Sequence, residues 1–98
     1  MAKLKVIWSK EAKENFQQIA LFYNHLTSNA KYSTRLYRMI KDSLRLASRY
    51  PYMYPATSVQ DTRVFVCEYF KVFYSVNKEF LMVEAVFDTR QNPDKAPY

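Results

Sequence analysis

Glycine is absent from the 98 residues of this sequence. The favoured Asn-Gly and Asp-Gly hairpin turns are therefore excluded, and so is every glycine-rich loop that cradles a phosphate in nucleotide-binding proteins. The single cysteine, Cys67, can form no disulfide within the chain and cannot hold a zinc ion alone. It lies in an apolar stretch, which favours a buried, inert thiol over a nucleophile.

Histidine and clustered acids are equally scarce. The one histidine, His25, has no partner at a ligand or catalytic spacing, so we interpret it as a solvated loop residue. Aspartate and glutamate are scattered along the chain. We therefore expect no metal and no cofactor, and the sequence disfavours metal-dependent and nucleophilic enzymes.

Long apolar runs are missing as well. No run approaches the roughly 18 apolar residues that cross a membrane, so we expect no membrane association. The first five residues contain two lysines but no apolar segment follows them closely, which argues against a signal peptide. Together with the lone cysteine, these features predict a cytoplasmic protein.

Positive charge and aromatic rings are what the chain has in excess. Fifteen Lys and Arg against nine Asp and Glu give a net charge of +6, which favours an anionic partner: nucleic acid, a lipid surface or an acidic protein segment. Nine Tyr and seven Phe can bury large areas in a short chain. The length predicts a single domain over residues 1–98.

The first half of the chain reads as one strand and two helices. Residues 3–8 alternate basic and apolar side chains as a half-buried strand does, and Ser9 is a good helix N-cap. Apolar residues at helical spacing predict a helix to about residue 26 and a second from a cap at Ser28 or Asn29 to residue 50, before Pro51. The apolar stripe of the second helix consists of Tyr37, Ile40, Leu44 and Ala47, with Leu36 beside it.

The second half changes to the period of two that strands show. Residues 63–67, 70–76 and 80–87 predict three strands with short connections, hence an antiparallel meander, while residues 91–98 read as irregular. The order β-α-α-β-β-β predicts an α+β fold: an antiparallel sheet with a helical hairpin packed on one face.

Basic and phenolic side chains on these strands are the candidate site. They are Arg63, Lys71, Tyr74 and Arg90. Strand alternation places Lys71 on the face away from the helices and Phe70 and Val72 toward them. A concave basic surface could hold a phosphate and stabilise a phosphorane-like transition state without a metal. A merely solvated strand face in a basic protein is an equally good interpretation.

Several segments, in order, resemble one known family. They are Val6-Ile7-Trp8-Ser9 before the first helix, the long helical pair, the strand opened by Arg63, Tyr69-Phe70-Lys71-Val72-Phe73-Tyr74, and Val86-Phe87-Asp88-Thr89-Arg90-Gln91-Asn92-Pro93. Together they resemble the RelE/ParE superfamily of type II toxin–antitoxin toxins, also called plasmid-stabilisation proteins. The resemblance covers nearly the whole chain.

The resemblance implies an acidic antitoxin partner, a hetero-oligomer with it, and one of two activities. RelE-like members are ribosome-dependent endoribonucleases that cut mRNA without a metal, and ParE-like members inhibit DNA gyrase. Arg63, Lys71 and Arg90 match the family's basic strand positions and would be catalytic in a nuclease, with Tyr74 and Asp88 as weaker candidates.

Departures from the family pattern favour the ParE-like activity. Asp88 stands where several members have histidine, and Lys71 stands where arginine is common. The run before Arg63 lacks the paired lysines of the best RelE nucleases, and Asp88 or Glu68 would need a perturbed pKa to act as a base. The nuclease, a non-toxic antitoxin-binding member and a general RNA-binding domain stay open as alternatives, so the sequence does not decide whether the protein is an enzyme.

Overall fold

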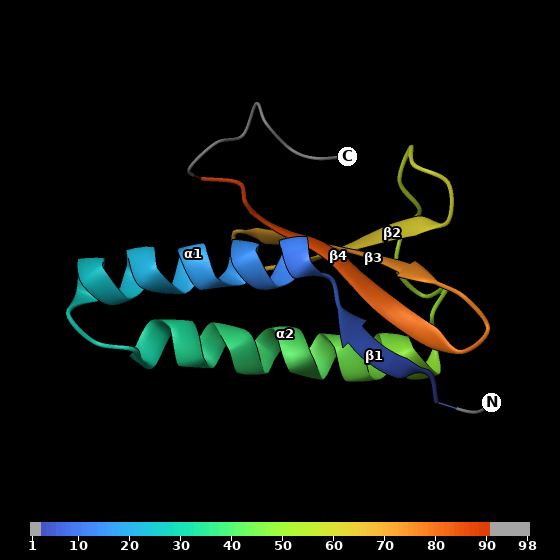
Figure 1. Cartoon of the computed structure of the whole chain (residues 1–98), viewed down its shortest axis with the longest axis horizontal. Coiled ribbons are helices and arrows are strands. Elements are labelled where there is room, and N and C mark those ends of the chain that lie inside the picture. Colours follow the sequence, from blue (N-terminus) through green and yellow to red (C-terminus); the bar gives the residue numbers. More distant parts are fainter. Residues whose placement is uncertain (1–2, 91–98) are drawn as a thin grey trace.

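The computed structural model describes residues 3–90, which form two helices and a four-stranded sheet (Figure 1). The elements, in chain order, are β1 (Lys5–Trp8), α1 (Lys10–Thr27), α2 (Lys31–Arg49), β2 (Thr62–Cys67), β3 (Phe70–Val76) and β4 (Phe80–Asp88). Figure 1 shows the two helices side by side as a hairpin along one face of the sheet. The predicted α+β order is confirmed, and the segment predicted to be irregular, 91–98, lies outside the described residues.

Polar side chains set the helix ends. Ser9 caps α1 as predicted, because its Oγ accepts a 3.0 Å hydrogen bond from the N–H of Ala12. Ser28 ends α1 in the left-handed conformation, with a φ of 62°. The N-cap position of α2 is Ala30, but the Oδ1 of Asn29 accepts the N–H of Lys31 at 2.9 Å. The predicted N-cap of α2, Ser28 or Asn29, is therefore one or two residues too early: Ser28 instead ends α1, and Asn29 supports the first turn of α2 from the position before its N-cap.

The sheet is mixed, with the strand order β1-β4-β3-β2. Strands β2, β3 and β4 form the predicted antiparallel meander, whereas β1 lies parallel to β4, which corrects the expectation of a purely antiparallel sheet. The two helices carry the chain out and back, so β2 starts at the same end of the sheet as β1. After two reversals β4 again runs in the direction of β1.

The core lies between the helical hairpin and one face of the sheet. As predicted, Phe70 and Val72 face the helices, together with Tyr74, and all three are fully buried. On α2 the buried stripe passes through Leu36, whereas Tyr37 stays 41% exposed. Other buried members are Ala12, Ile19, Tyr23, Ile40, Leu44, Ala47, Phe65, Cys67, Leu81, Val83 and Val86. Within residues 3–90 no helix has the length and apolarity to cross a membrane.

Candidate functional site

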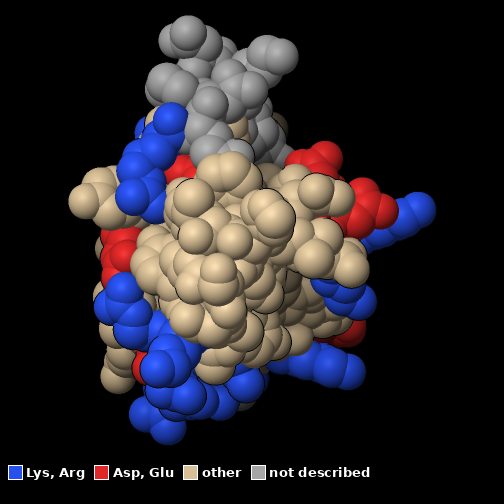
Figure 2. All heavy atoms as spheres, turned by 90° about the vertical axis from the view of Figure 1, so that its left-hand side faces the viewer, with Lys and Arg blue, Asp and Glu red and all other residues tan. Residues whose placement is uncertain are grey.

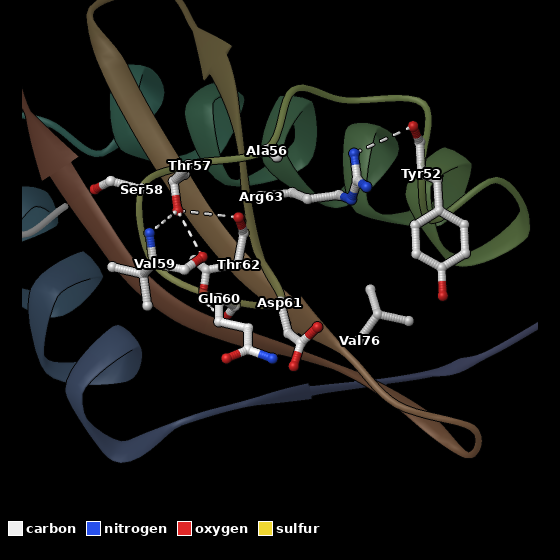
Figure 3. A pocket seen from close by; sticks show the side chains of 10 residues that line it. All are labelled: Tyr52, Ala56, Thr57, Ser58, Val59, Gln60, Asp61, Thr62, Arg63 and Val76. Atoms are coloured by element: carbon white, nitrogen blue, oxygen red, sulfur yellow. Dashed lines mark hydrogen bonds between the residues drawn. The ribbon is translucent and has the colours of Figure 1, made fainter.

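Arg63 holds the connection between α2 and β2. Its Nη1 donates to the carbonyl of Tyr54 at 2.7 Å and to that of Tyr52 at 3.4 Å, and its guanidinium lies 4.9 Å from the centre of the Tyr52 ring. Figure 3 shows this side chain extended toward Tyr52 at the edge of a hollow of about 340 Å³. Arg63 is thus already bound to main-chain oxygens of its own molecule.

The hollow beside Arg63 is lined mainly by the loop of residues 56–61, which internal hydrogen bonds stabilise. The hydroxyl of Thr57 accepts the N–H of Val59 at 3.1 Å and lies 3.0 Å from the carbonyl oxygen of Thr62 (Figure 3). Asp61 adopts a left-handed φ of 61°, which costs a residue with a side chain some strain. Arg63 and Asp61 are the charged residues of the lining, so the hollow carries balanced charge rather than a surplus that would attract a phosphate.

Lys71 and Arg63 lie on opposite faces of the sheet. Arg63 pairs in register with Tyr74, which faces the helices, whereas Lys71 pairs with Val66 and Phe87 on the other face. Arg90 follows β4 at the end of the sheet where Phe70 pairs with Asp88. The structure does not bring the three predicted basic residues together, and a catalytic role for any of them remains a prediction.

Tyr74 is part of the core. Its side chain is fully buried, and its hydroxyl donates a 2.8 Å hydrogen bond to the carbonyl of Pro51. Burial raises the pKa of Tyr74 to about 12, against a smaller opposing effect of the nearby Arg63. The phenol is therefore protonated at neutral pH and anchors the segment after α2.

Arg90 and Asp88 meet Tyr23 of α1 at the other end of the sheet. The buried carboxylate of Asp88 accepts the Tyr23 hydroxyl at 2.7 Å and the N–H of Arg90 at 3.0 Å. Nη2 of Arg90 donates to the same Tyr23 oxygen at 2.7 Å. Desolvation is the largest single influence on the pKa of Arg90 and lowers it, but Tyr23 with its hydrogen bond, followed by Tyr32 and Asp88, together raise the pKa above its ordinary value. Tyr23, Asp88 and Arg90 thus form one hydrogen-bonded group, with a 3.9 Å ion pair between Oδ1 of Asp88 and Nε of Arg90.

Glu68, the other carboxylate that could have served as a base, is also engaged. Its Oε2 accepts the Tyr32 hydroxyl at 3.2 Å, and its Oε1 forms a 3.2 Å ion pair with Arg35. Burial, followed by the charge of Glu68 and its hydrogen bond, raises the pKa of Tyr32. Both candidate bases are thus occupied by donors that the helices supply.

Tyr23 and Tyr32 were missed as site residues by sequence reasoning. Tyr23 fits the apolar periodicity of α1, and nothing local shows that its hydroxyl reaches a strand end 65 residues later. No three side chains of His, Cys, Asp or Glu within residues 3–90 come together in a way that could hold a metal ion.

An aromatic groove lies between the two helices and β1. The rings of Trp8, Phe16 and Tyr37 contact one another, with centroid distances of 6.3, 6.0 and 5.3 Å. Two adjoining hollows of about 340 and 410 Å³ share Trp8 and Tyr37. Cationic side chains line these hollows: Lys3, Lys13, Lys41 and Arg45. We call this surface the aromatic groove; an amphipathic acidic segment is its natural complement.

The sequence matches no family model and no curated protein. Solved structures do match. A chain of the chromosomal ParDE TA system from P. aeruginosa superposes with a TM-score of 0.74 at 12% identity, over 88% of this chain and 96% of that one. A chain of the E. coli DinJ-YafQ toxin–antitoxin complex gives a TM-score of 0.56 at 10% identity, over 91% and 96%. The protein therefore has the RelE/ParE-like fold that the sequence predicted.

Proposed function

We propose that this protein is the toxin of a type II toxin–antitoxin module, that an acidic antitoxin neutralises it, and that its target is DNA gyrase. Two observations support the toxin role: the fold likeness to the ParDE and DinJ-YafQ structures, and the family segments of the sequence. Gyrase acts on DNA in the cytoplasm, so we propose that compartment for the toxin.

We choose DNA gyrase over mRNA as the target because the side chains that could act as acid or base are already bonded within the molecule. Asp88 and Glu68 are each bound by a tyrosine hydroxyl and lie beside an arginine, and the Tyr74 phenol is buried and bonded to a carbonyl. General acid–base catalysis needs a group that can exchange a proton with the substrate. A toxin that acts by binding a protein needs no such group, which supports the ParE-like activity.

The aromatic groove is the surface we propose for the antitoxin. Tyr37 is 41% exposed between Trp8 and Phe16, and Lys41 lies 5.5 Å from its ring centre. An antitoxin helix with two apolar side chains could fill the adjoining hollows, while its carboxylates approach the surrounding lysines. The net charge of +6 would speed the encounter.

A ribosome-dependent endoribonuclease is the second candidate. The exposed guanidinium of Arg90, stacked 4.0 Å from the centre of the Tyr69 ring, favours it, because stacked arginines bind phosphates and unpaired bases. This candidate predicts codon-positioned cuts in mRNA on ribosomes that disappear in Arg90→Ala or Lys71→Ala proteins that still fold. Cleavage that persists in both variants would reject these residues as catalytic.

Growth after induction tests the toxin role without assuming a target. Induced expression should arrest growth, and co-expression of a short acidic protein encoded beside the gene should restore it. Normal growth at high expression would instead support a non-toxic member that only binds its antitoxin.

A further inference from the structure

A stack of four side chains joins the C-terminal half of α1 to the end of the sheet. Its members, in order of contact, are Phe22, Tyr23, Arg90 and Tyr69. The rings of Phe22 and Tyr23 meet edge to face with their centroids 4.9 Å apart, and the guanidinium lies 5.4 Å from the Tyr23 ring centre and 4.0 Å from that of Tyr69. We call these four residues the Arg90 stack.

Three of the four members of the Arg90 stack are partly open to solvent. Phe22 is 46% exposed, Tyr69 is 52% exposed, and the Arg90 side chain is 43% exposed. On the same half of α1, Leu21 and Leu26 are 58% and 65% exposed. Figure 2, which faces the hairpin end of the molecule, shows a broad uncharged surface bordered by many Lys and Arg and by fewer Asp and Glu side chains. Phenylalanine, tyrosine and arginine are enriched in protein-binding surfaces, and the exposed leucines on the same half of α1 add apolar area to this one.

The guanidinium of Arg90 is fixed before any partner arrives. The Tyr23 hydroxyl accepts from Arg90 and donates to the buried Asp88, and Asp88 also accepts the main-chain N–H of Arg90. A flexible arginine loses side-chain freedom when it binds, whereas one that is already held loses little. Asp88, the nearer carboxylate, is buried and forms a 3.9 Å ion pair with Nε of Arg90, which helps to hold the guanidinium in place. Glu68 is exposed, but its oxygens are engaged by Tyr32 and Arg35 rather than by Arg90.

We propose that the Arg90 stack is the surface that binds the toxin's protein target, through a segment that combines carboxylates with apolar side chains. In this arrangement Arg90 is the anchor and Tyr23 is its positioning residue. The exposed leucines favour a protein over a nucleic acid, because aliphatic side chains gain little against a phosphate backbone. The inference rests on the proposed function, and it separates the target surface from the aromatic groove proposed for the antitoxin.

The test compares Arg90→Ala with Arg49→Ala, which removes the same charge from an exposed position in the last turn of α2. Growth arrest, inhibition of gyrase supercoiling and affinity for the antitoxin are measured for each purified or expressed protein. Arg90→Ala should weaken growth arrest and gyrase inhibition by about tenfold or more, with antitoxin affinity within about threefold of the wild type. Arg49→Ala should behave like the wild type.

Tyr23→Phe tests the positioning role, because it keeps the ring and removes only the hydroxyl. It should weaken inhibition less than Arg90→Ala does, and the double variant should be no weaker than Arg90→Ala alone, since both changes act through one guanidinium. Additive losses would reject the positioning role and indicate a general loss of structure, which thermal unfolding of the same proteins would show.

The failures are distinguishable. A wild-type protein that arrests growth without inhibiting gyrase rejects the proposed target, while the variants still test the surface through growth. A toxic wild type with an equally toxic Arg90→Ala variant rejects the surface alone, as does a parallel loss of antitoxin affinity. A wild type without toxicity rejects both. If the wild type cleaves mRNA on ribosomes and Arg90→Ala does not, the Arg90 stack acts in RNA cleavage, which rejects its role in binding a protein target.

Discussion

Asp88 and Tyr23 are 65 residues apart in the sequence and share a buried hydrogen bond of 2.7 Å. The bond ties the end of β4 to the C-terminal half of α1 and gives both groups a structural role. It also changes the interpretation of Asp88. At the sequence level this residue was a possible base in place of the family's histidine, whereas in the structure its oxygens are taken up by Tyr23 and by the backbone of Arg90.

Asp88→Ala should therefore reduce the free energy of unfolding by about 2–3 kcal/mol, because it leaves a buried hydroxyl and a main-chain N–H without their acceptor. Urea denaturation followed by circular dichroism measures the change. Asp42→Ala is the matched control: its exposed 3.5 Å pair with Arg45 should contribute less than about 1 kcal/mol. Equal stabilities of the two variants would contradict the structural role of Asp88.

The raised pKa of Tyr74 leads us to expect that the free energy of unfolding falls at high pH. Its pKa is about 12 in the folded protein, above the ordinary value of 10.0, so the folded state holds this proton more tightly than the unfolded state does. This stabilisation is complete below pH 10 and falls between pH 10 and 12, by up to about 1.4 kcal/mol per pH unit.

Tyr74→Phe isolates this effect. At pH 7 the variant should be less stable by about 1 kcal/mol, because the hydrogen bond to Pro51 is lost. The difference between the two proteins should shrink as the pH rises above 10 and then reverse sign, because phenylalanine does not titrate and the linked loss by pH 12 is larger than about 1 kcal/mol. A difference that stays constant from pH 8 to pH 11.5 in urea titrations would contradict the assignment.

The two neighbouring apolar residues of α2 should respond differently to truncation. Leu36 is 1% exposed, so Leu36→Ala should lower the free energy of unfolding by about 2–5 kcal/mol through the cavity it leaves. Tyr37→Ala should cost less, because 41% of that side chain already contacts solvent. Urea denaturation measures both variants. A larger loss for Tyr37→Ala would contradict the finding that Leu36, and not Tyr37, faces the core.

Tyr37→Ala should nevertheless weaken antitoxin binding by about thirtyfold, the effect of removing roughly 2 kcal/mol of contact at the centre of an interface. Isothermal titration with the antitoxin measures it. Tyr50→Ala, which removes a tyrosine that is 58% exposed just after α2, serves as the control and should leave the affinity unchanged. Similar losses of antitoxin affinity in both variants would contradict binding of the antitoxin in the aromatic groove.

Much of the fold could be predicted because local signals agreed with it. The Ser9 cap, Pro51 after α2 and the alternation of Phe70, Val72 and Tyr74 each depend on neighbours in the sequence. The parallel position of β1 beside β4 was not predicted, since it follows from the path of the whole chain rather than from any segment.

The candidate site could be predicted only in part. Arg63, Lys71 and Arg90 were recognised as basic residues on strands, but their separation depends on which face each strand presents and at which end of the sheet each residue lies. The contacts of Arg90 with Tyr23 and Tyr69 join three distant segments. A sequence pattern carries no direct sign of such contacts.

Supercoiling by purified DNA gyrase, measured in parallel with mRNA cleavage on translating ribosomes, tests the central proposal most directly. The ParE-like activity predicts that the protein blocks supercoiling, that stoichiometric antitoxin restores it, and that mRNA on ribosomes stays intact. Unchanged supercoiling together with codon-positioned mRNA cuts would contradict it and identify the protein as a RelE-like nuclease.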